Sequence, residues 1–149
     1  MTAMTHNVSH PDSIAPHAHS AVSSRAARYT GRALSGLMVL ALGMDCAIHL
    51  LHTRQAVEGT VALGFSENVL FPLGLIQLAA LVMYVVPRTA ALGALLWTGY
   101  LGGAVATHVR AGHPLLTHTL VPVFVATVLW AGLVLRDRRV RNVLPFTNL

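Results

Sequence analysis

Four long apolar segments constrain what this chain can fold into. Each has close to the ~20 residues with which an α-helix crosses about 30 Å of hydrocarbon. The segments cover residues 33–51, 69–86, 89–109 and 115–135. The first break, residues 52–68, is longer, and we predict a loop there. The later breaks are short, Pro87-Arg88 and Gly112-His113-Pro114, so the helices on either side must run antiparallel. The pattern predicts an all-α fold, an antiparallel four-helix transmembrane bundle.

The composition excludes several other classes of protein. Charged residues make up 10% of the 149 residues, whereas soluble domains average about 25%, so we expect the lipid bilayer as partner. The ten basic residues are all arginines scattered at segment ends, which argues against binding to nucleic acid. The single cysteine, Cys46, excludes an internal disulfide, a Cys-x-x-Cys redox pair and an iron–sulfur cluster.

Polar segments flank the predicted membrane domain, residues 33–135. Residues 1–32 mix histidines with Pro, Ser, Thr and Ala without a helical or strand period, so we expect a disordered, His-containing tail. Residues 136–149 form a basic C-terminal tail. Of the ten arginines, only Arg54 and Arg110 lie on the side away from the termini. Because positive charge is retained in the cytoplasm, we expect both termini to be cytoplasmic.

Small residues within the segments predict close packing between helices. Gly36 and Gly43 lie in the first segment, and Gly99, Gly102 and Gly103 lie in the third. In membranes, small side chains allow neighbouring backbones to approach. We therefore expect these glycines at helix–helix contacts.

Ionisable residues inside the apolar segments need a physical reason, because each costs about 2.5–3.5 kcal/mol on insertion scales. Asp45, His49 and His52 are spaced four and three apart, so they form one stripe on the first helix. The other helices bring polar groups to the same level, and Gln77 and Tyr100 lie deeper, near the midplane. The groups at that level are Glu67, Asn68, His108, Arg110, His113 and His118. This distribution predicts a shared polar cluster in the non-cytoplasmic half of the bundle.

Three interpretations of this cluster remain open at this stage. In the first, the polar groups only satisfy one another and stabilise the bundle. In the second, imidazole and carboxylate groups hold zinc, copper or iron, with His49, His52 and His108 as the candidate ligands, or a haem lies between two of these histidines. In the third, the cluster is a small-molecule pocket, in which Asp45 or Glu67 moves a proton through a histidine and Arg110 holds a ligand oxygen.

Several runs resemble the DoxX-like family of small four-helix membrane proteins. They are Phe71-Pro72-Leu73-Gly74, Val86-Pro87-Arg88, the stretch from Gly102 to Arg110 that contains Ala106-Thr107-His108-Val109-Arg110, and Gly112-His113-Pro114-Leu115. The resemblance extends over about residues 33–145. It implies a multi-pass protein of the bacterial inner membrane, related to the membrane subunit of thiosulfate:quinone oxidoreductase, and it draws attention to Glu67, His108 and Arg110.

The resulting hypothesis is quinone-linked or proton-coupled redox chemistry in an outward-facing pocket. His108 and Arg110 would bind an oxygen of the quinone or substrate, while Asp45 and His49 relay its proton. Gln77, Tyr100 and His118 are candidate substrate contacts, and Glu67 is a further candidate catalytic carboxylate. The protein would then be a membrane oxidoreductase or a subunit of one, beside a partner subunit or in a homo-oligomer. The alternative from another class is a non-catalytic membrane scaffold or binding protein.

Overall fold

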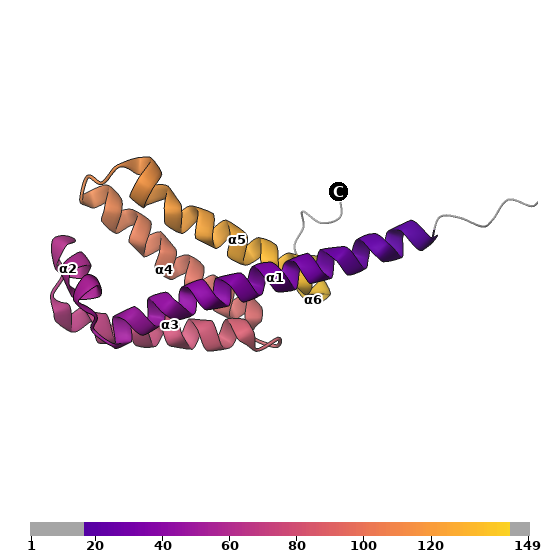
Figure 1. The fold of residues 1–149 in the computed structure, drawn as a ribbon, viewed down its shortest axis with the longest axis horizontal. Helices are drawn as coiled ribbons and strands as arrows, with labels where there is room; N and C mark the ends of the chain where they lie inside the picture. The colour runs from indigo at the N-terminus through magenta and orange to yellow at the C-terminus, as the bar shows by residue number, and fades with distance from the viewer. Residues whose placement is uncertain (1–16, 144–149) are drawn as a thin grey trace, which may run out of the picture.

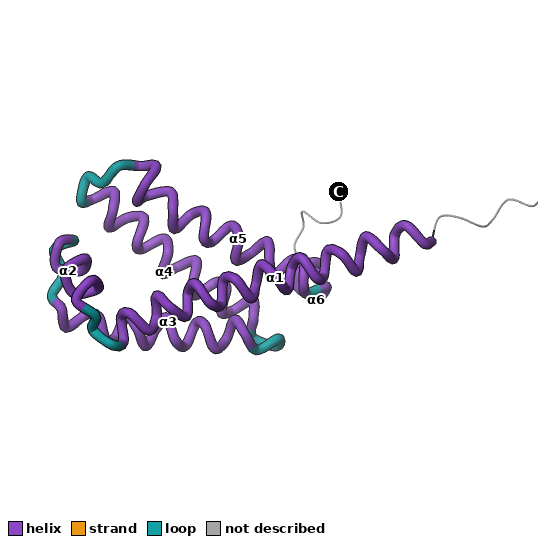
Figure 2. The backbone as a smooth tube through the Cα atoms, viewed as in Figure 1, coloured by secondary structure: helices purple, strands orange, loops and turns teal. Residues whose placement is uncertain are grey.

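The computed structural model describes residues 17–143, with side chains placed for residues 25–142. Its α-helices are α1 (His17–Leu50), α2 (Arg54–Ala62), α3 (Leu70–Val85), α4 (Ala90–Arg110), α5 (Leu120–Arg136) and α6 (Arg138–Val143). A 3-10 turn, η1 (Glu67–Val69), leads into α3, and a π-helical turn, η2 (Leu115–Thr119), leads into α5. No strand occurs in residues 17–143 (Figure 2), which confirms the all-α prediction.

Four of the described helical segments are long and apolar enough to cross a bilayer. They are Arg25–Leu50, Glu67–Val85, Ala90–Arg110 and Leu115–Arg136. Each of α1 and α4 packs against both α3 and α5, so the four long helices close into a ring in which neighbours are antiparallel (Figure 1). The predicted transmembrane bundle is therefore confirmed, and the chain is a multi-pass membrane protein in contact with lipid.

Helix boundaries differ from the predictions where the chain leaves the apolar segments. The first helix begins at His17 instead of residue 33, so the predicted tail is helical from there on, while residues 1–16 lie outside the described residues. In Figure 1, α1 runs well past the other helices at its N-terminal end. Alanine and arginine favour the helix in water as well as in lipid, so hydropathy marks where lipid begins and not where the helix begins. For the same reason α2 and α6 appear inside segments predicted as loop and tail.

The helices approach most closely at glycines other than the predicted ones. A Cβ on Gly93 of α4 would lie 2.7 Å from the Ala80 carbonyl oxygen of α3, and one on Gly132 would lie 2.9 Å from Ser35 Oγ. By contrast, a Cβ on Gly36, Gly99, Gly102 or Gly103 would meet no other described atom within 4 Å, so these glycines do not mediate packing within the chain. Which face of a helix is buried depends on its rotation in the bundle, which glycine positions alone do not reveal.

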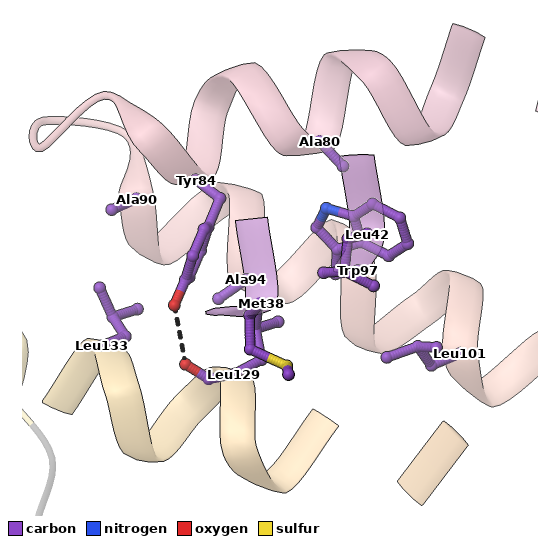
Figure 3. Close-up of a cluster of buried hydrophobic side chains, with 10 residues drawn as sticks. All are labelled: Met38, Leu42, Ala80, Tyr84, Ala90, Ala94, Trp97, Leu101, Leu129 and Leu133. Carbon is purple, nitrogen blue, oxygen red and sulfur yellow. Dashed lines mark hydrogen bonds between the residues drawn. The ribbon is translucent and has the colours of Figure 1, made fainter. Parts of the chain in front are cut away.

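A buried core joins all four long helices near the end opposite α2. Tyr84 and Trp97 are its largest side chains, and both are fully buried (Figure 3). The Tyr84 hydroxyl donates to the Leu129 carbonyl oxygen (3.0 Å) and lies 3.1 Å from Ser35 Oγ, so it ties α3 to α5 and α1. From this core the α1–α3 pair and the α4–α5 pair diverge toward the end that carries α2, as Figures 1 and 2 show. We call that end the α2 end.

Candidate functional site

An open pocket of about 420 Å³ lies at the α2 end of the bundle. Its walls come from three parts of the chain: α1, α2 with the residue that follows it, and the connection from α4 to α5. The lining residues are Asp45, Ile48 and His49 of α1, Gln55, Ala56, Gly59, Thr60, Ala62 and Leu63 of α2 and its end, and His108, His113 and His118 of the α4–α5 connection. The pocket therefore gathers four imidazoles and one carboxylate.

The turn between α4 and α5 presents three of these imidazoles together. Gly112 has φ of +70°, a left-handed conformation that glycine adopts without strain, and the chain reverses there. The π-helical turn η2 then brings His118 beside the other two rings. The ring centroids lie 5.1 Å apart for His108 and His113, 5.1 Å for His113 and His118, and 5.7 Å for His108 and His118. Such wide turns occur frequently at functional sites.

A hydrogen bond joins the rings of His108 and His113. Their Nδ1 atoms are 2.9 Å apart, which is a hydrogen-bond distance. Because one ring nitrogen must donate and the other accept, only one of the two Nδ1 atoms carries a proton. His118 Nδ1 is occupied in a different way, at 2.8 Å from the Thr117 hydroxyl. The three rings thus form an imidazole cluster that can hold or pass a proton at the pocket wall.

On the opposite wall, Asp45 and His49 are oriented by neighbouring polar groups. His49 Nδ1 lies 2.8 Å from the Asp45 carbonyl oxygen and 3.8 Å from Asp45 Oδ1. Since a carbonyl oxygen only accepts, Nδ1 carries the proton and Nε2 of the neutral ring is left as an acceptor. Asp45 Oδ2 accepts a hydrogen bond from Gln77 Nε2 at 2.6 Å, which directs the carboxylate. The Asp45 side chain remains 45% exposed, against 16% for His49, so the carboxylate faces the open pocket.

Five of the predicted site residues do not line the pocket, and three of the five lie where helices begin or end. His52 has φ of +48°, ends α1, and stacks on Phe71 with ring centroids 6.5 Å apart. Glu67 is exposed in η1. Arg110 donates from Nη2 to the Leu63 carbonyl oxygen at 2.6 Å and lies over the Phe65 ring at 5.9 Å. Arg110 therefore tethers the segment after α2 to the end of α4 instead of facing the pocket.

The two predicted midplane residues lie behind the pocket. Gln77 is fully buried in α3 and reaches the site only through its bond to Asp45. Tyr100 of α4 packs edge-on against Trp97, with ring centroids 5.5 Å apart. Neither residue lines the pocket, and of the two only Gln77 hydrogen-bonds to a pocket residue among the described contacts.

The predicted metal ligands are not assembled. In the described part of the chain, no group of three or more His, Cys, Asp or Glu residues is placed to hold a metal ion. The predicted set of His49, His52 and His108 fails at His52, because the left-handed backbone there ends α1 and the ring packs on Phe71 outside the pocket. The metal interpretation therefore has no support from this geometry.

Sequence reasoning missed the contribution of α2. This helix was predicted as loop, yet it provides six of the lining positions when Leu63 is included. A local signal is present: the Thr53 hydroxyl accepts from Ala56 N (3.4 Å), and Arg54 Nε donates to Glu58 Oε1 (2.7 Å) one turn later. A capping threonine followed by an i,i+4 ion pair is typical of a short helix. His113 was also left out of the predicted site residues, although it completes the imidazole cluster.

Comparison with protein-family models gives a match that covers the pocket. A model described as the DoxX-like family matches residues 33–132. The chain belongs to the DoxX-like family. The recognition made from the Phe-Pro-Leu-Gly and Ala-Thr-His-x-Arg runs is thus confirmed. Every lining residue of the pocket, from Asp45 to His118, lies inside the part that matches the DoxX-like model. Comparisons with curated proteins and with solved structures gave no match.

Proposed function

We propose that this DoxX-like protein binds a quinone-type ligand in the pocket at the α2 end and supports proton-coupled redox chemistry there. The observation that carries the proposal is the meeting of four imidazoles and one carboxylate, from three separate parts of the chain, around about 420 Å³. Groups that exchange protons near neutral pH are costly in a bilayer and mark functional sites there. A quinone is soluble in lipid and needs protons at its two oxygens when it is reduced.

The residues divide the work by their hydrogen-bonding capacity. In the His108–His113 pair, the ring whose Nδ1 accepts carries its proton on Nε2. That N–H donates to one ligand oxygen. His49 Nε2 is an acceptor, so it takes a proton from a quinol or from water. Asp45, directed by Gln77, receives that proton at the open side of the pocket. Oxidation of the quinol releases two electrons, which pass to an oxidoreductase partner subunit, and two protons, of which His49 takes one and the imidazole cluster takes the other. Reduction of the quinone runs the same steps in reverse.

The proposal changes the roles of several predicted residues. Arg110 acts on the ligand indirectly, by holding the segment after α2 in place, because its guanidinium is bonded to Leu63. His118 contributes the third ring of the cluster. Gln77 positions Asp45, and Glu67 has no part in the mechanism.

The distribution of arginines supports an orientation for the site. Arg54 and Arg110 are near the α2 end, whereas the other arginines of the described helices lie toward the opposite end or in the turn after α3. Under the positive-inside rule, both termini are cytoplasmic and the pocket opens toward the outer side of a bacterial inner membrane. A ligand would then reach the pocket from the outer leaflet or from the periplasm.

Binding of a short-chain quinone to purified protein tests the proposal. Ubiquinone-1 and menadione are titrated into protein in detergent micelles, and binding is followed by isothermal calorimetry against protein-free micelles. We expect His108→Ala and Asp45→Ala to weaken binding at least tenfold. His52→Ala is the matched control, because His52 lies at the end of the same helix as Asp45 but outside the pocket, and we expect it to bind as the wild type does.

Thermal unfolding of the same variants separates this proposal from the scaffold alternative. If neither quinone binds the wild-type protein above the micelle background, or if His108→Ala and Asp45→Ala bind normally, the proposal fails. A large loss of stability in those variants without any quinone binding would favour a cluster that only stabilises the bundle, because buried partners would then be left unpaired.

A further inference from the structure

Two buried polar atoms behind the pocket have complementary hydrogen-bonding needs. Gln77 Oε1 and Trp97 Nε1 are both fully enclosed and find no hydrogen-bond partner among the described residues. Gln77 Nε2 donates to Asp45 Oδ2, which fixes the other end of the amide as the acceptor oxygen. An indole nitrogen can only donate. The core therefore contains one buried acceptor and one buried donor, each without a partner.

Packing of α3 against α4 places these two residues about one helical turn apart along the bundle. The closest approach of the pair is at Gly93, where a Cβ would press on the Tyr84 backbone nitrogen and lie 2.7 Å from the Ala80 carbonyl oxygen. Because the helices are antiparallel, one turn forward from Gly93 brings Trp97 opposite Ala80, and Gln77 follows one turn further along α3. Figure 3 shows the nitrogen of the Trp97 indole on the side of the ring that faces α3, beside Ala80. Gln77 lies one helical turn from Ala80 on the same face of α3, so the two unpaired atoms belong to neighbouring turns of the core.

Leaving both atoms unpaired is energetically costly. A buried donor or acceptor without a partner destabilises a protein, because the group has lost its hydrogen bond to water and gained none in exchange. One water molecule can accept from Trp97 Nε1 and donate to Gln77 Oε1, and buried waters in proteins typically satisfy such pairs. The pocket provides a route of entry, since Asp45 both lines it and is bonded to Gln77.

We propose that a buried water molecule joins Trp97 Nε1 to Gln77 Oε1 and extends the polar network of the pocket into the core. The series then runs from Trp97 through the water and the Gln77 amide to the Asp45 carboxylate. In this arrangement the water prevents the amide from rotating, so Gln77 and Trp97 are positioning residues for Asp45. The proposal goes beyond quinone binding and does not depend on it, because a water at this position is required by the two side chains alone.

Nuclear Overhauser effects from water to the indole N–H groups test the proposal in the ligand-free protein. The chain has two tryptophans, and ¹⁵N-tryptophan labelling gives one indole signal for each. Trp130→Phe assigns the signals. Trp130 serves as the internal control, since its Nε1 already donates to Thr98 Oγ1 at 2.9 Å. We expect a cross-peak between Trp97 Hε1 and water, with the sign of a long-lived bound molecule, and none for Trp130.

Substitution of Gln77 gives the second arm. Gln77→Leu removes the acceptor, and we expect the water cross-peak of Trp97 to weaken at least severalfold. Ser35→Ala removes a different buried polar group, at the Tyr84 hydroxyl instead of the Trp97 indole, and should leave the cross-peak unchanged. If wild-type Trp97 shows no water cross-peak, or if Gln77→Leu leaves it at full strength, the proposed water is overturned. The first of these measurements needs no substitution at the site, so it remains decisive even if Gln77→Leu fails to fold.

Discussion

Arg110 is expected to hold α2 closed over the pocket, and its replacement should open that wall. The tether consists of the Nη2 hydrogen bond to the Leu63 carbonyl oxygen (2.6 Å) and the guanidinium over the Phe65 ring (5.9 Å). A hydrogen bond from a charged donor contributes about 1 kcal/mol once solvent exposure is allowed for. An exposed cation–π contact adds about 0.5 kcal/mol. Loss of both in Arg110→Ala corresponds to about a tenfold increase in the open population.

Alkylation of a cysteine on the buried face of α2 measures that population. Thr60 is a suitable position, because it lines the pocket and is only 9% exposed. In a Cys46→Ser background, Thr60→Cys is reacted with a bulky maleimide. The conditions are chosen so that the alkylation rate is proportional to the fraction of molecules in which α2 is open. We expect the rate to rise about tenfold when Arg110→Ala is added.

The control for this experiment is the other arginine at the α2 end. Arg54 pairs with Glu58 on α2 itself (2.7 Å) and, in the described chain, bonds to no other helix. Arg54→Ala should therefore leave the alkylation rate unchanged. If Arg110→Ala reacts at the rate of its parent, or if Arg54→Ala accelerates the reaction equally, Arg110 is not the tether.

Substitutions at four further positions test the packing and the turn after α4, each measured by thermal unfolding in detergent. Gly93→Ala should lower stability by about 1–3 kcal/mol, because its Cβ would press on the α3 backbone. Gly99→Ala, on the same helix with no described atom within 4 Å, should be neutral or slightly stabilising, and equal losses in the two would contradict the packing. Tyr84→Phe should cost about 0.5–1.5 kcal/mol by removing the bond to the Leu129 carbonyl, and an unchanged midpoint would exclude that bond as a stabilising contact. Gly112→Ala should cost about 1–2 kcal/mol from its left-handed backbone although no atom clashes, and Gly112→Asn should lose less.

Prediction of the site from the sequence succeeded where helical spacing and depth in the membrane were sufficient. Asp45 and His49 share a face because they are four residues apart, and both line the pocket. His108 and His118 lie at the same depth as that pair and line the opposite wall. His52 continues the same sequence spacing, yet it lies outside the site because α1 ends there. Helical periodicity holds only while the helix continues.

The amino-acid sequence alone determined that this is a membrane protein with four spanning helices in antiparallel order. Apolar length and short polar breaks are local properties, and the energetic cost of unpaired backbone in lipid leaves few alternatives. Only the tertiary structure decided that Gly93 and Gly132 are the close contacts, that α2 forms a wall of the pocket, and that Arg110 bonds to Leu63. These features depend on how each helix is rotated about its axis and on where the connecting turns lie. Both result from contacts between residues far apart in the chain.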